Sequence, residues 1–282
     1  MTRILALLAL AGVLTACTTT STTTRGGVVS ETTSSASLPA PPSSAGGSPD
    51  RVTASDESEA TRRARVRMEL ASAYFSRGQM EVALDQIKLA IAADPNLGEA
   101  FNLRGLIYAN LGDDRLAEES FARALQLNPR DGDTMHNQGW YLCQRKRYAE
   151  ATAAFDRALA QPAYAGGTRT LLAKGVCLAF DKKYVEAEQS LSRAWAFEPS
   201  NPSIGTNLAE VLYRLGRYDR AQATIQRVNA LPGVANAQTL WLAARIERRL
   251  GNVQALAQLG SRLRKDFPNA PETEAFDQGR FE

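Results

Sequence analysis

The chain has 282 residues, of which 44% are hydrophobic and 22% are charged, with 33 Lys and Arg against 30 Asp and Glu. A formal net charge of +3 gives no reason to expect nucleic acid or an anionic bilayer as a partner. The length would allow two domains, but the repetition within residues 61–270 favours one array behind an N-terminal segment.

Residues 1–16 are predicted to be a secretory leader that is removed rather than a part of the fold. Arg3 supplies its positive start, and residues 4–13 form an apolar run too short to span a bilayer. The four residues that end at Cys17 read LTAC, which resembles the bacterial lipobox. That resemblance implies cleavage before Cys17 and acylation of its thiol and amine. The alternative is an ordinary secreted protein with a chance cysteine.

Residues 17–60 are predicted to be the lipidated Cys17 followed by a disordered linker. The segment is rich in Ser, Thr, Pro, Ala and Gly and has no aromatic residue, so it cannot bury a core. A flexible chain of this length has a root-mean-square reach of roughly 35–40 Å. Several acyl chains on one cysteine make a stable anchor. Thr18, where Asp would resemble an inner-membrane retention signal, favours the outer membrane.

Small, bulky and proline residues recur in residues 61–270 at steps of mostly 34 residues. The small residues are Ala71, Gly105, Gly139, Gly175, Ala209 and Ala244, with Ala83, Ala117, Ala151, Ala187 and Ala221. The bulky residues are Ile87, Phe121, Phe155, Leu191 and Ile225, and the prolines are Pro95, Pro129 and Pro199. This pattern resembles the tetratricopeptide repeat (TPR), a pair of helices that binds other proteins far more often than it catalyses.

The repeat predicts an all-α superhelical solenoid of six helix-turn-helix units. The units are expected to start near Ala64, Gly98, Gly132, Thr168, Pro202 and Ala237, and the last is a degenerate cap. Gly78, Gly112 and Gly216 stand where the first helix of a unit must end. Lys146 and Lys182 hold that position in two units, where the turn is less ideal. A single unit cannot bury its apolar face, so neighbours must stack. Residues 271–282 are left as a C-terminal tail.

No residue pattern in the sequence indicates an enzyme. His136 is the one histidine, and the sequence lacks HExxH, GxSxG, CxxC and a Gly-rich phosphate loop. Glu118, Glu119, Glu186 and Glu188 are predicted to lie on solvated helix faces. We therefore expect no catalytic residue, no metal, no cofactor and no small-molecule substrate, and an enzyme or small-molecule binder stays only as a third alternative.

Cys143 and Cys177 are separated by 34 residues and fall in the first helices of adjacent units. Adjacent, packed helices would bring the two side chains close, and an exported protein meets an oxidising compartment. The pair is therefore a disulfide candidate, and two separately buried thiols are the alternative.

The inner face of the array is the predicted partner groove. The TPR resemblance implies that certain first-helix positions line it. They hold Phe75, Asn102, Leu106, Asn110, His136, Trp140, Leu172, Val176, Phe180 and Tyr213. The central strip is apolar and suits an apolar or helical segment of a partner. Arg245, Arg248 and Arg249 are interpreted as the solvated face of the cap.

Four stretches extend the resemblance to a particular family. They are residues 136–143 (HNQGWYLC), 174–177 (KGVC), 240–246 (LWLAARI) and 263–268 (LRKDFP). Together with the lipobox and six units, they resemble PilF/PilW-type lipoproteins of type IV pilus biogenesis, called pilotins. The long Ser/Thr linker departs from the family pattern.

The family resemblance implies an outer-membrane lipoprotein on the periplasmic face. It further implies a lipid anchor in the outer membrane and binding to the pilus secretin, which promotes the localisation and multimerisation of the secretin there. The alternative is a TPR lipoprotein adaptor that recruits or regulates peptidoglycan enzymes. Genomic neighbourhood would separate these two hypotheses.

Overall fold

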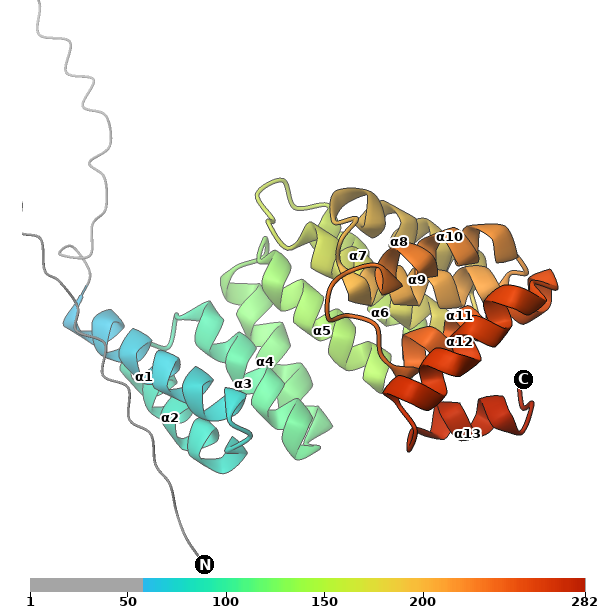
Figure 1. Ribbon diagram of the computed structural model, residues 1–282. Coiled ribbons are helices and arrows are strands. Elements are labelled where there is room, and N and C mark those ends of the chain that lie inside the picture. Colours follow the sequence, from blue (N-terminus) through green and yellow to red (C-terminus); the bar gives the residue numbers. More distant parts are fainter. Residues whose placement is uncertain (1–57, 282) are drawn as a thin grey trace, which may run out of the picture. The chain divides into compact units, whose positions relative to one another are not determined.

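The computed structural model describes residues 58–281. The predicted leader, Cys17 and nearly all of the predicted linker 17–60 lie outside the described residues. Thirteen α-helices and no strand form in the described range (Figure 1). None of these helices is both long enough and apolar enough to cross a bilayer.

Twelve of the helices form six antiparallel pairs, and a short helix follows them. The first helices of the pairs are α1 (Glu59–Ser76), α3 (Gly98–Leu111), α5 (Gly132–Gln144), α7 (Gly167–Phe180), α9 (Pro202–Arg214) and α11 (Ala237–Leu250). The second helices are α2 (Met80–Ala93), α4 (Asp114–Leu127), α6 (Tyr148–Leu159), α8 (Tyr184–Phe197), α10 (Tyr218–Asn229) and α12 (Val253–Asp266). The last helix is α13 (Pro271–Asp277).

The predicted TPR solenoid is confirmed, and four of the six predicted starts match a helix start to the residue. The remaining two differ: α7 begins one residue before Thr168, and α1 begins five residues before Ala64. α1 begins earlier because the Ser58 hydroxyl caps it, accepting a hydrogen bond from the Thr61 amide.

The turns inside the units share one left-handed backbone residue. Gly78, Gly112 and Gly216 have φ of 75°, 82° and 70° at this position. Lys146 and Lys182 adopt the same conformation, with φ of 61° and 59°. A side chain in this region costs about 1–2 kcal/mol, so the two lysine turns are formed against a local penalty.

The predicted small and bulky positions meet inside each unit. Gly105 lies beneath Phe121, Gly139 beneath Phe155 and Gly175 beneath Leu191, and all six are buried. A Cβ atom at Gly105 would stand 2.7 Å from the Phe121 ring. The absence of a side chain on the first helix therefore lets the second helix approach closely.

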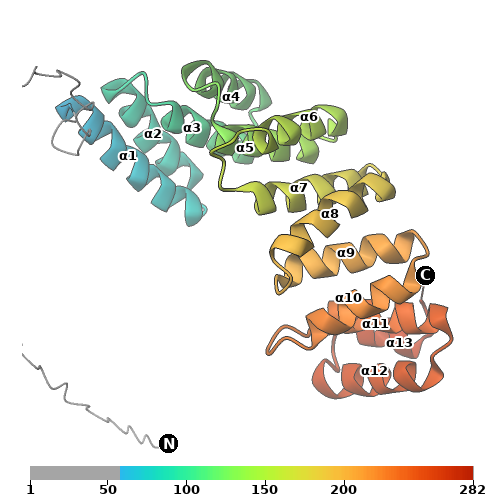
Figure 2. The same cartoon turned by 90° about the horizontal axis from the view of Figure 1, so that it is seen from above.

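The first helices form the inner layer of the array. Each first helix contacts the first helix of the next unit, whereas no two second helices within the described residues pack against each other. The second helices of the first five units, α2, α4, α6, α8 and α10, pack instead against the first helix that follows (Figure 2). Because the first helices lie closer together, their free sides make up the concave face.

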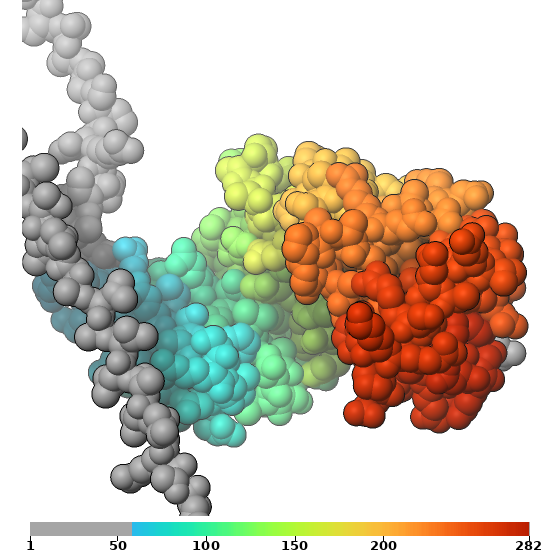
Figure 3. All heavy atoms as spheres, in the orientation of Figure 1, coloured from blue at the N-terminus to red at the C-terminus, as the bar shows by residue number. Residues whose placement is uncertain are grey.

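The residues predicted to be a C-terminal tail are largely docked onto the array. α13 packs against α11 and α12, and Phe276 and Phe281 stand 6.5 and 4.9 Å from the Trp241 ring, centroid to centroid. In the sixth unit Gly260 replaces the bulky residue of the second helix, and a Cβ there would collide with Phe276. α13 thus supplies the missing bulk, and its atoms continue the surface of the last units (Figure 3).

Replacing Gly175 by Ala should destabilise the protein. The new Cβ would lie 2.5 Å from Leu191 Cγ and 3.3 Å from the Ala187 carbonyl oxygen. Overpacking of this kind lowers the free energy of unfolding by about 1–3 kcal/mol. The higher helix propensity of Ala relative to Gly offsets at most about 1 kcal/mol of that loss. Gly167→Ala, which meets nothing within 4 Å, is the matched control. Thermal unfolding followed by circular dichroism should show a lower Tm for Gly175→Ala alone, and equal melting of both variants would contradict the close-approach model.

Candidate functional site

All ten predicted groove residues lie on first helices, but their exposure differs. Phe180 is 60% exposed and Asn110 is also exposed. Six others are half-buried: Phe75, Asn102, Leu106, Trp140, Leu172 and Val176. His136 and Tyr213 are buried. The accessible apolar part of the predicted strip is thus centred on the C-terminal half of α7.

His136 is a core residue in the structure rather than a groove residue. Its Nδ1 atom lies 2.9 Å from the Thr170 hydroxyl, and its ring stands 5.8 Å from the Phe155 ring. Burial, together with the positive charge of Arg169, lowers the pKa of His136 to about 4. The imidazole is therefore neutral at pH 7 and serves the packing of α5 against α7.

Tyr213 is covered by residues of the next unit. The Arg245 guanidinium stacks 4.4 Å from the centre of its ring, and Arg249 Nε donates to its hydroxyl over 3.4 Å. The Tyr218 ring lies 5.6 Å away on the other side of the turn. Tyr213 therefore holds side chains on the inner face in place but offers little surface to a partner.

The half-buried residues of the strip also stabilise the core. Leu106 and Trp140 pack against the cluster that contains Phe121 and Tyr141. Leu172 touches two separate core clusters. A substitution at these positions would change the packing of the core as well as the surface of the groove. A substitution of Phe180, which projects into solvent, would change the groove surface without disturbing the core.

Polar side chains link neighbouring first helices across the inner face. Asn137 Nδ2 donates to Asn102 Oδ1 over 3.1 Å, joining α5 to α3. Arg169 pairs with Asp133 over 2.5 Å, joining α7 to α5. These links join neighbouring first helices, and the exposed Asp133–Arg169 pair contributes at most about 1 kcal/mol.

The structure joins Cys143 of α5 to Cys177 of α7 in a disulfide. Their Cα atoms lie 5.8 Å apart, and both residues are buried, with 3% and 0% exposure. The bond joins the first helices of two neighbouring units, so it ties this part of the inner layer together. Its oxidation in the cell stays a prediction.

The sequence interpretation missed an arginine site at the end of the inner face. A hollow of about 460 Å³ is lined by Arg245, Arg248, Arg249, Gly279 and Phe281. The interpretation of Arg245 as a solvated residue is wrong, because only 9% of it is exposed. A signal for this was present: Arg245 occupies the same place in its unit as Trp140 does in the third.

Family models for the tetratricopeptide repeat match residues 98–131, 132–160 and 181–246. The chain is 24% identical to the type IV pilus assembly protein PilF of Pseudomonas aeruginosa over 209 residues, 74% of this chain and 82% of PilF. The solved structure of that organism's PilF superposes with a TM-score of 0.69 at 23% identity, over 79% of this chain and 100% of PilF.

The solved structure of PilW, described as a widely conserved type IV pilus biogenesis factor, decides the family. It superposes with a TM-score of 0.68 and 31% identity, over 75% of this chain and 97% of PilW. This chain belongs to the PilF/PilW family of type IV pilus biogenesis TPR proteins. The resemblance inferred from four short stretches and the repeat is thereby confirmed.

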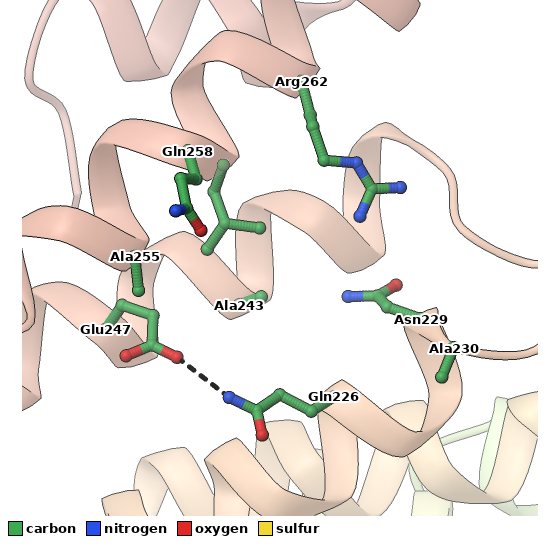
Figure 4. Close-up of a pocket in the computed structure, with 9 residues that line it drawn as sticks. Gln226, Asn229, Ala230, Ala243, Glu247, Ala255, Gln258 and Arg262 are labelled. Carbon is green, nitrogen blue, oxygen red and sulfur yellow. Dashed lines mark hydrogen bonds between the residues drawn. The ribbon is translucent and has the colours of Figure 1, made fainter.

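A second hollow of this PilF/PilW-family protein lies between α10, α11 and α12. It measures about 320 Å³, and Figure 4 shows Gln226, Gln258 and Arg262 around it. The carboxylate of Glu247, 3% exposed, accepts hydrogen bonds from the side-chain amides of Gln222, Gln226 and Asn252. The neighbouring amides satisfy the hydrogen-bonding needs of the Glu247 carboxylate. Glu247 therefore has a structural role beside this hollow and needs no ligand.

The carboxylates predicted to be solvated are mostly engaged in ion pairs. Glu118 pairs with Arg147 over 2.6 Å and accepts from the Tyr141 hydroxyl, whose pKa is raised mainly by desolvation. The prediction for Glu188 is wrong, because it is 6% exposed and pairs with Arg217 and Arg220. No group of three or more His, Cys, Asp or Glu within residues 58–281 could hold a metal ion.

We predict that this family member, isolated without reductant, contains the Cys143–Cys177 bond. Closing a loop of this size stabilises the native state by about 3–4 kcal/mol in the chain-entropy model, so reduction should lower Tm by several degrees. Alkylation of denatured protein with and without reductant, read by mass spectrometry, measures the oxidation directly. The double variant Cys143→Ala/Cys177→Ala is the control for the melting shift, since reductant should not change its Tm. Two freely alkylated thiols in unreduced protein would refute the bond.

Proposed function

We propose that the protein is a non-catalytic, lipid-anchored scaffold of the outer membrane that binds the type IV pilus secretin and promotes its multimerisation there. The observation that carries the proposal is the 31% identity to PilW across 97% of that structure. Membership of a family that acts in pilus biogenesis makes a pilus component the natural partner. The secretin is the component that the proposed anchor would bring within reach.

The inner face supports the proposal because it can receive a protein segment. Phe180 and the half-buried Val176 offer apolar surface near the C-terminal end of α7. The disulfide holds α5 and α7 in a fixed arrangement beside this surface. A preorganised apolar strip binds without paying for reordering of its own side chains.

The anchor part of the proposal rests on the sequence around Cys17. A short apolar run followed by LTAC gives signal peptidase II its recognition site, and the mature N-terminus would then carry the acylated cysteine. We infer that the acyl chains hold the protein at the periplasmic face of the outer membrane, with the TPR array in the periplasm.

Phe180→Asp should weaken secretin binding without unfolding the protein. The side chain is 60% exposed, and an unpaired charge would be desolvated in an apolar contact. Phe197→Asp is a matched control, because Phe197 is 68% exposed at the end of a second helix, α8. We expect heat- and detergent-resistant secretin multimers to fall in the Phe180 variant alone, with unchanged far-UV circular dichroism in both.

Two outcomes would redirect this proposal. If both variants support normal multimers, the contact lies away from the α7 end of the strip. If a strain that lacks the whole protein makes normal secretin multimers and normal surface pili, the proposed partner itself is wrong. Pulldown from detergent-solubilised outer membrane with mass spectrometry would then show which protein is bound instead.

Cys17→Ala should block lipidation and leave an uncleaved precursor, because signal peptidase II requires that thiol. Metabolic labelling with a clickable palmitate should mark the wild type and not the variant. The variant Cys143→Ala/Cys177→Ala retains Cys17 and should label normally. Labelling of the Cys17 variant at the wild-type level would contradict the anchor.

A further inference from the structure

Two adjoining hollows lie on the inner face of the last two units and share Arg245. The larger, of about 460 Å³, contains the arginine site of Arg245, Arg248 and Arg249. The smaller, of about 290 Å³, runs between α9, α11 and α13 and includes Trp241 and Glu210. Together they make a recess with a cationic end and an aromatic end.

The charges in the recess are unbalanced toward positive. Glu210 is shared by two cations, Arg214 at 2.7 Å and Arg245 at 3.2 Å. Arg248 and Arg249 have no carboxylate partner among residues 58–281. Glu247 faces α10 and α12 rather than the recess. Glu272 lines the smaller hollow, so the recess is lined by three arginines and two carboxylates and stays positive.

Aromatic rings orient the guanidinium groups. Arg245 stacks 4.4 Å from the Tyr213 ring centre, and Arg248 stacks 4.4 Å from that of Phe281. Stacking occupies the flat face of a guanidinium and leaves its edge N–H donors available. A planar carboxylate matches two such edge donors at once, which is the strongest hydrogen-bonded pairing available to arginine.

Arg245 is incompletely satisfied in the free protein. It is 9% exposed, yet its Nε atom has no hydrogen-bond partner within the described part of the chain. A buried cationic donor left unpaired is unfavourable, so added negative charge in the recess would be stabilising. Because that Nε atom is itself buried, the donors open to a ligand are those of the exposed Arg248 and Arg249.

We propose that Arg245, Arg248 and Arg249 form a carboxylate-binding site that takes an acidic segment of a protein partner. The arginines are held inside a recess between helices, which fits a single side chain or chain terminus better than a flat membrane surface. Glu210 already shows how a carboxylate sits against Arg245. The inference concerns the chemistry of the ligand and holds whether or not that partner is the secretin.

The test uses the purified full-length protein and a fluorescein-labelled peptide of six glutamates, with a six-glutamine peptide for comparison. Fluorescence anisotropy should show binding of the glutamate peptide alone, weakening as NaCl rises because the contacts are ionic. Arg248→Gln/Arg249→Gln should raise its Kd about tenfold by removing two charge-assisted contacts. Both residues are exposed, so unchanged melting is expected.

The matched control is Arg130→Gln/Arg193→Gln, which removes the same charge from exposed sites elsewhere on the array. Its Kd should stay within about twofold of the wild type if attraction is local to the recess. Equal binding of both peptides, or equal weakening by the two double variants, would overturn the proposal. So would loss of co-sedimentation with phosphatidylglycerol vesicles in the Arg248/Arg249 variant without loss of peptide binding, which would assign the arginines to a membrane.

Discussion

The array depends on one contact that recurs in every internal unit: a bulky side chain of the second helix standing on a small residue of the first. Phe121 over Gly105 and Phe155 over Gly139 are its clearest forms. Because the contact brings the two backbones together, it sets the crossing of each pair and the surface that the pair presents to the next. The inner layer and the disulfide inherit their geometry from this repeated approach.

This contact explains why so much of the fold is predictable from the sequence. Both partners belong to one unit, so they recur together at the repeat spacing and mark its phase. The reversal within each unit is also local, and Lys146 and Lys182 could be recognised as poor turn residues without any structure. Cys143 and Cys177 follow the same logic, since one repeat of separation places them on neighbouring first helices.

The features that escaped prediction depend on contacts that have no period. α13 falls outside the repeat, and its docking becomes apparent only when Phe276 and Phe281 meet Trp241 in three dimensions. His136 occupies a groove position by number, but its burial depends on neighbouring residues such as Thr170 in the next unit. Position within a repeat says which layer a residue joins; the neighbouring units decide how much of it remains exposed.

The placement of Phe276 against Gly260 has a consequence for how such arrays change in evolution. An internal unit offers its second helix to whichever unit comes next, so duplication of a gene segment can insert another copy. In the sixth unit that docking surface is already occupied by the chain's own α13. A further repeat could dock at this end only if α13 were displaced. We therefore expect repeats to be gained or lost more easily among the units before the sixth.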